Sequence, residues 1–213
     1  VYKVLLFYKY VNLDNPQELV DAHLNWCMKN EIKGRVFFAH EGVNGTVSGV
    51  TENIERYKSH LKTFPEFWDI WFKEDDSESH TFKKMHVRLK NEIVHGDLKG
   101  VSIENGGKRL TPEQLRKFYE EQKDFVIVDA RNWYESKIGK FKNAVTPPLK
   151  NFREWTEFAD NELSSLKEKT IVTYCTGGIR CEKASAYLVE KGFKDVYQLD
   201  GGIVNYIKQY PDT

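Results

Sequence analysis

The chain has 213 residues, of which 40% are hydrophobic and 14% aromatic, enough for one large or two small domains with real hydrophobic cores. Its 32 basic and 32 acidic residues give zero net charge, which excludes a global basic field for nucleic acid but leaves room for a local basic patch. Three cysteines are too few for a disulfide framework and lack zinc-ligand spacing, and no signal peptide or membrane-length apolar run is found, so we expect a cytoplasmic protein without a metal site.

The first half of the chain is predicted to alternate strands and helices. A near-continuous apolar and aromatic run indicates a first buried strand, and Asn15-Pro16 opens a helix that Gly34 ends. Thr51 is expected to cap a second helix. Strands are expected at residues 4–11, 35–39, 43–48, 68–73 and 85–94, and the second helix at 52–61. The order strand, helix, strand, strand, helix, strand predicts a ferredoxin-like α+β domain.

The stretch from His40 to Gly45 lies between two of these strands and has two interpretations. His40 and Glu41 could act as acid and base, although the spacing of a helical metal site is absent. The residues favour a tight turn, in which Gly42 and Gly45 adopt special backbone angles and Asn44 bonds locally.

Basic side chains cluster near the last strand of this half. In an extended strand, residues two apart share a face, so Lys84, Arg88 and Lys90 are expected to line up beside His86. Such a stripe, with aromatic neighbours such as Trp71, could bind RNA phosphates, or it could be an ordinary solvated face. The sequence favours neither interpretation.

We place a domain boundary near Gly96, giving domains at residues 1–95 and 96–213. In the second half, Thr111-Pro112 is a strong helix start, with Thr as cap and Pro at the first helical position. Strands are expected at residues 125–129, 171–174 and 196–199, and helices at 152–163 and 181–191. This alternation predicts an α/β domain with a parallel sheet covered by helices on both faces.

The strongest motif follows the strand at residues 171–174, where Cys175 stands before Thr-Gly-Gly-Ile-Arg and a new helix. The carboxyl end of a strand in an open α/β sheet is where ligands bind. Gly177 and Gly178 allow successive amides to turn inward as an anion-binding nest, and the helix adds its amino-terminal N–H groups. Such a cradle lowers the pKa of a thiol, and the thiolate is the nucleophile. A lone cysteine is more often merely buried, but this loop favours a reactive one.

We assign roles within this loop as follows. Cys175 is the nucleophile or persulfide carrier. Arg180 either pairs with Glu182 or braces the loop. Cys181 is favoured as a packed residue over a second nucleophile, although the two cysteines could form a redox pair. The backbone amides from Thr176 to Cys181 hold the charge of the sulfur, which involves Thr176, Gly177, Gly178, Ile179, Arg180 and Cys181.

The stretch Cys-Thr-Gly-Gly-Ile-Arg-Cys-Glu-Lys-Ala resembles the active-site loop of rhodanese-like domains and, more narrowly, that of the bacterial tRNA uridine hydroxylase family. Four residues separate Cys175 from Arg180, as in sulfurtransferase loops, whereas phosphatase relatives have one more. The resemblance implies a ferredoxin-like (acylphosphatase-like) domain followed by a rhodanese-like α/β domain with a parallel sheet. It covers nearly the whole chain but not the cysteine-rich C-terminal tail common in the family.

The resemblance also implies a function. The family converts wobble uridine in tRNA to 5-hydroxyuridine with molecular oxygen as co-substrate, and Cys175 would be required. No flavin or iron motif is present, so no further cofactor is expected. The alternative is rhodanese-type sulfur transfer through a Cys175 persulfide, with a sulfur-donor protein as partner. A non-enzymatic binding module is least favoured, because the cysteine is intact.

The resemblance also implies roles for residues outside the cysteine loop. Asp129, Arg131 and Glu135 correspond to residues that buttress the loop in rhodanese-like domains, while the residues themselves favour a buried ion pair that holds the sheet. His40 and Asn44 belong to a stretch that, by the same resemblance, could face the RNA.

Overall fold

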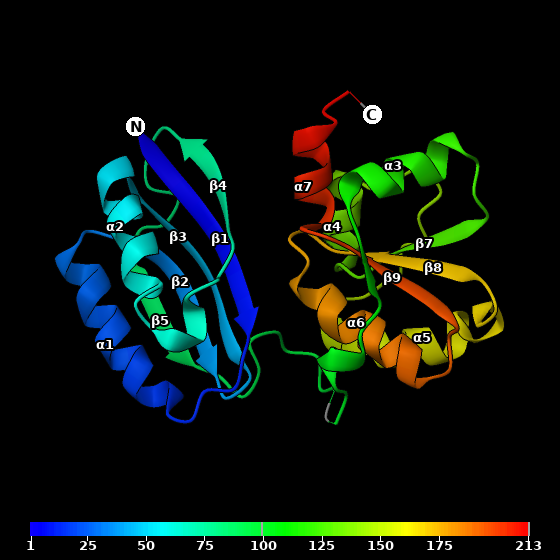
Figure 1. Ribbon diagram of the computed structural model, residues 1–213, viewed down its shortest axis with the longest axis horizontal. Helices are drawn as coiled ribbons and strands as arrows, with labels where there is room; N and C mark the ends of the chain where they lie inside the picture. Colours follow the sequence, from blue (N-terminus) through cyan, green and yellow to red (C-terminus); the bar gives the residue numbers. More distant parts are fainter. Residues whose placement is uncertain (99, 213) are drawn as a thin grey trace. The chain divides into compact units, whose positions relative to one another are not determined.

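The structure is a computed structural model that describes residues 1–98 and 100–212. It divides into two compact units, the first from Val1 to Val94 and the second from His95 onward (Figure 1). Each unit has its own sheet and its own hydrophobic core. In the described part of the chain, none of the helices has the length and apolar character needed to cross a membrane.

The described part of the first unit is a five-stranded sheet covered by two helices (Figure 1). The strand order is β4-β1-β3-β2-β5, with β1 antiparallel to β3 and β4, β2 antiparallel to β3, and β5 parallel to β2. This is the predicted ferredoxin-like order with β5 added at one edge. The elements are β1 (Tyr2–Tyr10), α1 (Pro16–Lys29), β2 (Lys33–Ala39), β3 (Gly42–Val50), α2 (Thr51–Leu61), β4 (Phe72–Ser77) and β5 (Met85–Leu89).

The core of this unit lies between the sheet and the helices. Leu5 and Phe7 of β1 are fully buried, as expected for alternate residues on one face of a strand. They belong to one cluster with Val36 and Phe38 of β2 and with Tyr57 of α2. The hydrophobic pattern of the sequence therefore specifies which face of the sheet the helices cover.

Several local predictions in this unit are wrong. Helix α1 ends at Lys29, where the chain turns through Asn30 and Glu31, and Gly34 lies inside β2 and does not end the helix. The last strand, β5, ends at Leu89 and does not extend to residue 94. The fourth strand begins at Phe72 and extends into the acidic segment, because Lys3 on the neighbouring strand pairs with Glu74 at 2.9 Å and with Asp76 at 2.7 Å. Thr51 does not cap α2. Its hydroxyl donates to the carbonyl of Val1 at 3.0 Å.

The second unit has a parallel sheet in the order β6-β9-β8-β7, as predicted from the alternation of elements. Helices α3 and α7 lie on one side of this sheet and α5 and α6 on the other (Figure 1). The strands are β6 (Lys108–Leu110), β7 (Phe125–Asp129), β8 (Thr170–Tyr174) and β9 (Asp195–Leu199). The helices are α3 (Pro112–Glu120), α4 (Trp133–Ile138), α5 (Trp155–Glu162), α6 (Ile179–Glu190) and α7 (Gly202–Gln209).

Strand β8 places the cysteine loop. It lies between β7 and β9, and Ile171 to Tyr174 are all buried, which explains their continuous apolar character. The helix start predicted at Thr111 is confirmed, since its side chain accepts from the amide of Gln114 in a capping box. Strand β6 was not predicted, because only one of its three residues, Leu110, is buried.

Candidate active site

Cys175 follows β8 directly and is fully buried. The amide of Gly178 donates to its Sγ at 3.1 Å, and the amides of Arg180 and Cys181 also form hydrogen bonds to this sulfur. Gly178 has φ of +102°, a left-handed conformation that glycine adopts without strain and that turns the amides inward. The loop thus surrounds the sulfur atom with N–H donors at the start of α6.

This cradle changes the acidity of Cys175. Burial alone raises the pKa of the thiol, but a hydrogen bond from Cys181, the charge of Arg180 and the loop amides outweigh it and lower the pKa to about 6. Cys175 is therefore mainly a thiolate at neutral pH, and the thiolate is the form that attacks electrophiles.

Arg180 joins the loop to α4. Its Nη1 donates to Glu135 Oε2 at 2.7 Å and its Nη2 to Glu135 Oε1 at 2.8 Å, while the Thr176 hydroxyl donates to Oε1 at 2.8 Å. Burial raises the pKa of Glu135, but these partners offset it and hold that pKa below its ordinary value. The sequence left open whether Arg180 pairs with Glu182 or braces the loop. In the structure it pairs with Glu135 and thereby braces the loop against α4.

Glu182 has a different set of partners. It accepts from Arg109 Nη2 at 2.6 Å and from Gln198 Nε2 at 3.2 Å. These contacts join α6 to β6 and β9, away from the guanidinium of Arg180. The ion pair between Glu182 and Arg109 therefore holds the edge strand β6 against α6.

Asp129 and Arg131 form a buried ion pair that extends to the cysteine loop. Arg131 Nη2 donates to Asp129 Oδ2 at 2.7 Å and to the carbonyl of Gly139 at 2.6 Å. The same Asp129 oxygen accepts from the hydroxyls of Tyr174 at 2.7 Å and Ser136 at 2.8 Å. Tyr174 is the residue before the cysteine, so the pair connects β7, α4 and the base of the loop.

The amino terminus of α7 holds the carbonyl side of the loop, which sequence reasoning missed. The amide of Ile203 donates to the carbonyl of Cys175 at 2.9 Å, and that of Val204 to the carbonyl of Thr176 at 3.2 Å. Gly202 has φ of +70°, and a Cβ there would lie 2.4 Å from the Cys175 carbonyl oxygen. The glycine pair before the last predicted helix was the available signal for this close approach.

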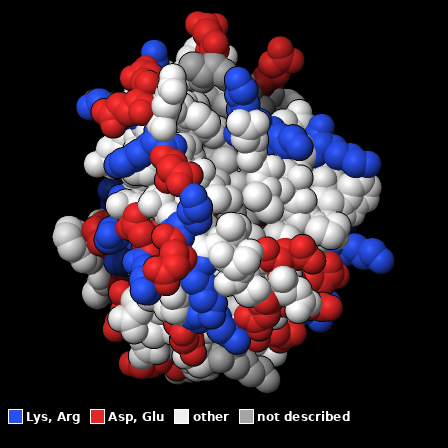
Figure 2. All heavy atoms as spheres, turned by 90° about the vertical axis from the view of Figure 1, so that its right-hand side faces the viewer, with Lys and Arg blue, Asp and Glu red and all other residues white. Residues whose placement is uncertain are grey.

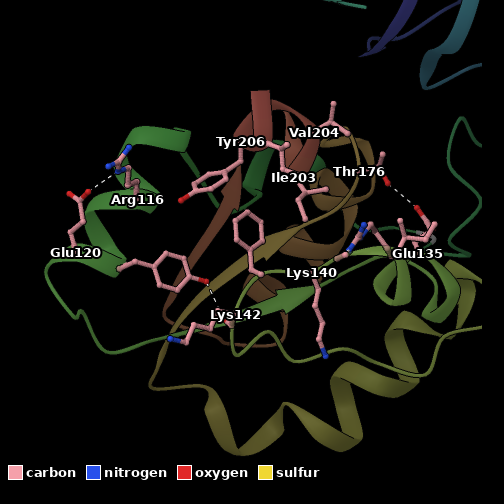
Figure 3. A pocket seen from close by; sticks show the side chains of 15 residues that line it. Arg116, Glu120, Glu135, Lys140, Lys142, Thr176, Ile203, Val204 and Tyr206 are labelled. Carbon is pink, nitrogen blue, oxygen red and sulfur yellow. Dashed lines mark hydrogen bonds and ion pairs between the residues drawn. The ribbon is translucent and has the colours of Figure 1, made fainter. Parts of the chain in front are cut away.

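A pocket of about 910 Å³ begins beside the loop at Thr176 and Glu135 (Figure 3). It runs between α3, α7 and the segment at residues 138–142. Phe141 and Tyr206 form an aromatic wall, with ring centroids 4.8 Å apart in an edge-to-face arrangement. The lining residues are Arg116, Tyr119, Glu120, Arg131, Glu135, Ile138, Gly139, Lys140, Phe141, Lys142, Thr176, Ile203, Val204, Tyr206 and Ile207.

Charged side chains surround an uncharged area on the surface of this unit. The face turned to the viewer in Figure 2 shows an uncharged area with lysine, arginine and acidic side chains of both signs around it. At the pocket, Arg116 pairs with Glu120 at 2.7 Å, and Lys140 and Lys142 are exposed. The pocket therefore combines an apolar interior with charged groups at its edge, an arrangement typical of small-ligand sites.

The tight turn predicted in the His40 to Gly45 stretch is limited to His40 and Glu41, and the residues from Gly42 onward belong to β3. His40 Nδ1 donates to the carbonyl of Leu13 at 2.9 Å. Asn44 Nδ2 donates to the carbonyl of Ile93 at 2.9 Å, so the prediction that Asn44 bonds locally is wrong. Gly42 has φ of +137°, but Gly45 does not have a positive φ, which corrects the prediction for that residue. Gly45 instead gives room to the ring of Phe7, which a Cβ would meet at 2.4 Å.

The predicted basic stripe lies along the edge strand β5. Lys84, Arg88 and Lys90 are exposed, while Val87 between them is buried, as strand alternation requires. Lys90 Nζ lies 5.5 Å from the centroid of the Phe37 ring. These residues and the Cys175 loop belong to different units.

Both units match known families. Residues 2–93 match the family described as UPF0176 acylphosphatase like domain, and residues 111–209 match the Rhodanese-like domain. A Rhodanese-like Domain Protein from Staphylococcus aureus has a crystal structure that covers 46% of this chain and 90% of its own, with 28% identity and a TM-score of 0.40.

Curated relatives match along almost the whole chain. A protein from Bacillus licheniformis named tRNA uridine(34) hydroxylase is 49% identical over 97% of this chain and 65% of its own length. A protein of the same name from Staphylococcus carnosus is 45% identical over 100% of this chain and 67% of its own. This chain thus spans about two thirds of the length of these relatives. The family resemblance predicted from the loop is confirmed, and the chain belongs to the tRNA uridine(34) hydroxylase family.

Proposed function

We propose that this protein hydroxylates the wobble uridine of tRNA at C5, with Cys175 as the catalytic nucleophile. One observation carries the proposal: the sulfur of Cys175 lies within a ring of amide donors that lowers its pKa to about 6. The names of the relatives supply the substrate and the reaction. A tRNA substrate would place the protein in the cytoplasm.

The chemistry of a pyrimidine explains why a thiolate is useful. C6 of a uracil ring is electrophilic, so the Cys175 thiolate can form a C–S bond there while the ring electrons move toward C5 and the C4 carbonyl. C5 then becomes nucleophilic and can accept an oxygen atom. Loss of the C5 proton and cleavage of the C–S bond return the thiolate and restore the double bond.

The oxygen atom would come from molecular oxygen. Its insertion leaves the second oxygen atom to form water, which consumes two electrons and two protons. A two-electron reductant is therefore a further co-reactant in this proposal.

Other residues have supporting roles in this proposal. Arg180, Glu135 and Thr176 keep the loop closed around the sulfur, and Asp129 with Arg131 fixes the end of β8. The stripe of Lys84, Arg88 and Lys90 binds tRNA phosphates, because exposed cations on an edge strand are open to a polyanion. His40, in the turn between β2 and β3, and Asn44, in β3, would lie near the RNA in this arrangement.

The experiment is mass spectrometry of the wobble nucleoside in cells that lack the protein and are complemented with the intact gene. Wild type and the Cys27→Ala variant, which alters a cysteine of the first unit, should restore 5-hydroxyuridine, whereas Cys175→Ser should not. Hydroxylation that persists with Cys175→Ser would contradict the proposal. Loss of a thiolated nucleoside in place of the hydroxylated one would assign the protein to sulfur transfer, with a Cys175 persulfide and a sulfur-donor protein.

A further inference from the structure

Two large aromatic side chains are exposed at the start of α4, beside the cysteine loop. Trp133 exposes 43% of its surface and Tyr134 exposes 50%. The next residue of the helix is Glu135, which accepts hydrogen bonds from Thr176 and Arg180 of that loop. Neighbouring exposed apolar side chains are typical of an interaction site, whereas a single one is not.

Hydrogen bonds hold the two aromatic residues in place. The amide of Trp133 donates to the carbonyl of Leu149 at 2.9 Å, and Asn132 Nδ2 donates to the Tyr134 hydroxyl at 2.9 Å. The ring planes are nearly perpendicular, at 84°, and their centroids are 6.1 Å apart. The pair therefore forms a corner, in which a flat ring that stacks on one side chain has the other at its edge.

Positive charges lie beside these rings. Lys137 Nζ is 4.3 Å from the centroid of the Trp133 ring, and Lys140 and Lys142 follow α4 as exposed residues. The segment from the aromatic pair to these lysines has one acidic residue, Glu135, and its carboxylate is already paired with the loop. Aromatic side chains with cations beside them suit single-stranded RNA, which offers bases to stack and phosphates to neutralise.

The burial of the nucleophile gives a reason for an aromatic surface at this place. Cys175 is fully buried, so a uridine that reaches it has to leave the base stack of the anticodon loop. The adjacent nucleotide then loses a stacking neighbour. An aromatic side chain of the protein close to the cysteine loop can replace that lost contact.

We propose that Trp133 and Tyr134 form a stacking platform for the unpaired nucleotide next to the wobble uridine, with Lys137 at its phosphate. This inference rests on the proposed function and deepens it, because it names the part of the tRNA that the second unit binds. The lysines beside the rings favour RNA over an apolar protein surface as the occupant. The platform is distinct from the basic stripe on β5, which belongs to the first unit.

The experiment measures binding of an anticodon stem-loop RNA that carries 2-aminopurine next to the wobble position, because the fluorescence of this base falls when it stacks. Trp133→Ala and Tyr134→Ala should each weaken binding by about five- to one-hundredfold, the effect of losing one stacked base, and relieve the quenching in the saturated complex. Trp133→Phe keeps a flat ring and should retain most of the affinity. The slope of log affinity against log salt should stay unchanged in these variants, since no charge is removed.

Two controls separate stacking from other effects. A fully paired RNA duplex of the same length reports phosphate binding alone, and its affinity should not change. Trp68→Ala removes a tryptophan of the first unit that is 68% exposed, and it should leave stem-loop binding unchanged. Where an alanine variant does not keep the wild-type melting curve, the leucine variant replaces it, because leucine retains apolar volume without a flat ring.

The outcomes distinguish the platform from the proposed function. Equal stem-loop affinities in wild type and both alanine variants would overturn the platform and favour a partner protein on these rings, while the proposed function would stand. Equal losses on the stem-loop and the duplex would also overturn it, because stacking would not be the cause. Wild-type protein that binds neither the stem-loop nor whole tRNA would contradict the proposed function itself.

Discussion

Arg180 and Glu135 connect the cysteine loop to helix α4 through two parallel hydrogen bonds of 2.7 and 2.8 Å. The two residues are 45 positions apart in the sequence, and each is largely buried. This bidentate geometry fixes the direction of the guanidinium as well as its position. The charge of Arg180 is thereby held in place, and it helps to lower the pKa of Cys175.

Glu135→Gln should loosen the loop, because it leaves the Arg180 guanidinium buried without its carboxylate. The expected loss in the free energy of unfolding is about 1–3 kcal/mol, measured by urea denaturation. Glu121→Gln, at an exposed acidic residue of the same unit, should change it little. Equal stability of the Glu135 variant and wild type would contradict the brace.

Gly202→Ala should displace the Cys175 and Thr176 carbonyls, which a Cβ would meet at 2.4 and 2.5 Å. We expect a lower melting temperature and slower alkylation of Cys175. Gly192→Ala is the matched control, since Gly192 also has a positive φ, of +86°, but nothing lies within 4 Å of its Cβ position. Equal effects of the two substitutions would mean that backbone strain alone, and not the contact with the loop, is responsible.

The reactivity of Cys175 toward iodoacetamide should follow a pH midpoint near 6 in the folded protein. Because the folded-state pKa is lowered, the reactive thiolate is present above this pH and is lost as the pH falls through it. In denaturant the midpoint should return to about 8.5, the value of a free cysteine. Peptide mass spectrometry separates Cys175 from Cys27, whose pKa burial raises to about 12. An ordinary titration curve for folded Cys175 would refute the enzymatic role.

Replacing Lys84, Arg88 and Lys90 together with glutamine should weaken tRNA binding and reduce its dependence on salt. Each phosphate contact contributes about 0.7–0.9 to the slope of log affinity against log salt, so the slope should fall by roughly 2 to 3. Filter binding at several salt concentrations measures this change. The control replaces Lys123, Lys169 and Lys194, three exposed lysines of the second unit. Unchanged affinity in the first variant, or an equal loss in both, would dispose of the stripe as a binding surface.

The sequence predicted correctly those elements whose bounds are determined by neighbouring residues. Strand β7 was predicted at its observed bounds, because a run of apolar β-formers ends at Asp129. The start of α3 followed from Thr111 and Pro112. Strand β4 was misplaced because its position depends on ion pairs with Lys3, a residue far away in the sequence.

In the candidate site, too, features formed by neighbouring residues were predicted from the sequence, and contacts between distant residues were not. The glycines after Cys175 indicated a loop that could bind an anion, and the structure shows Gly178 donating to the sulfur. The choice of Glu135 over Glu182 as the partner of Arg180 could not be made from sequence, because Glu182 is near in sequence and Glu135 is near only in the fold. The pocket walls come from α3, α7 and residues 138–142, so no single segment indicated it.

The bonds from Ile203 and Val204 to the loop carbonyls have a consequence for cooperativity. The carbonyl groups of Cys175 and Thr176 accept hydrogen bonds from the start of α7, so local opening of that helix also frees the backbone that carries the Cys175 sulfur. The amide protons of Ile203 and Val204 should therefore exchange with solvent deuterium in step with those of Gly178 and Cys181. A change that destabilises α7 should therefore also change the reactivity of the Cys175 thiolate.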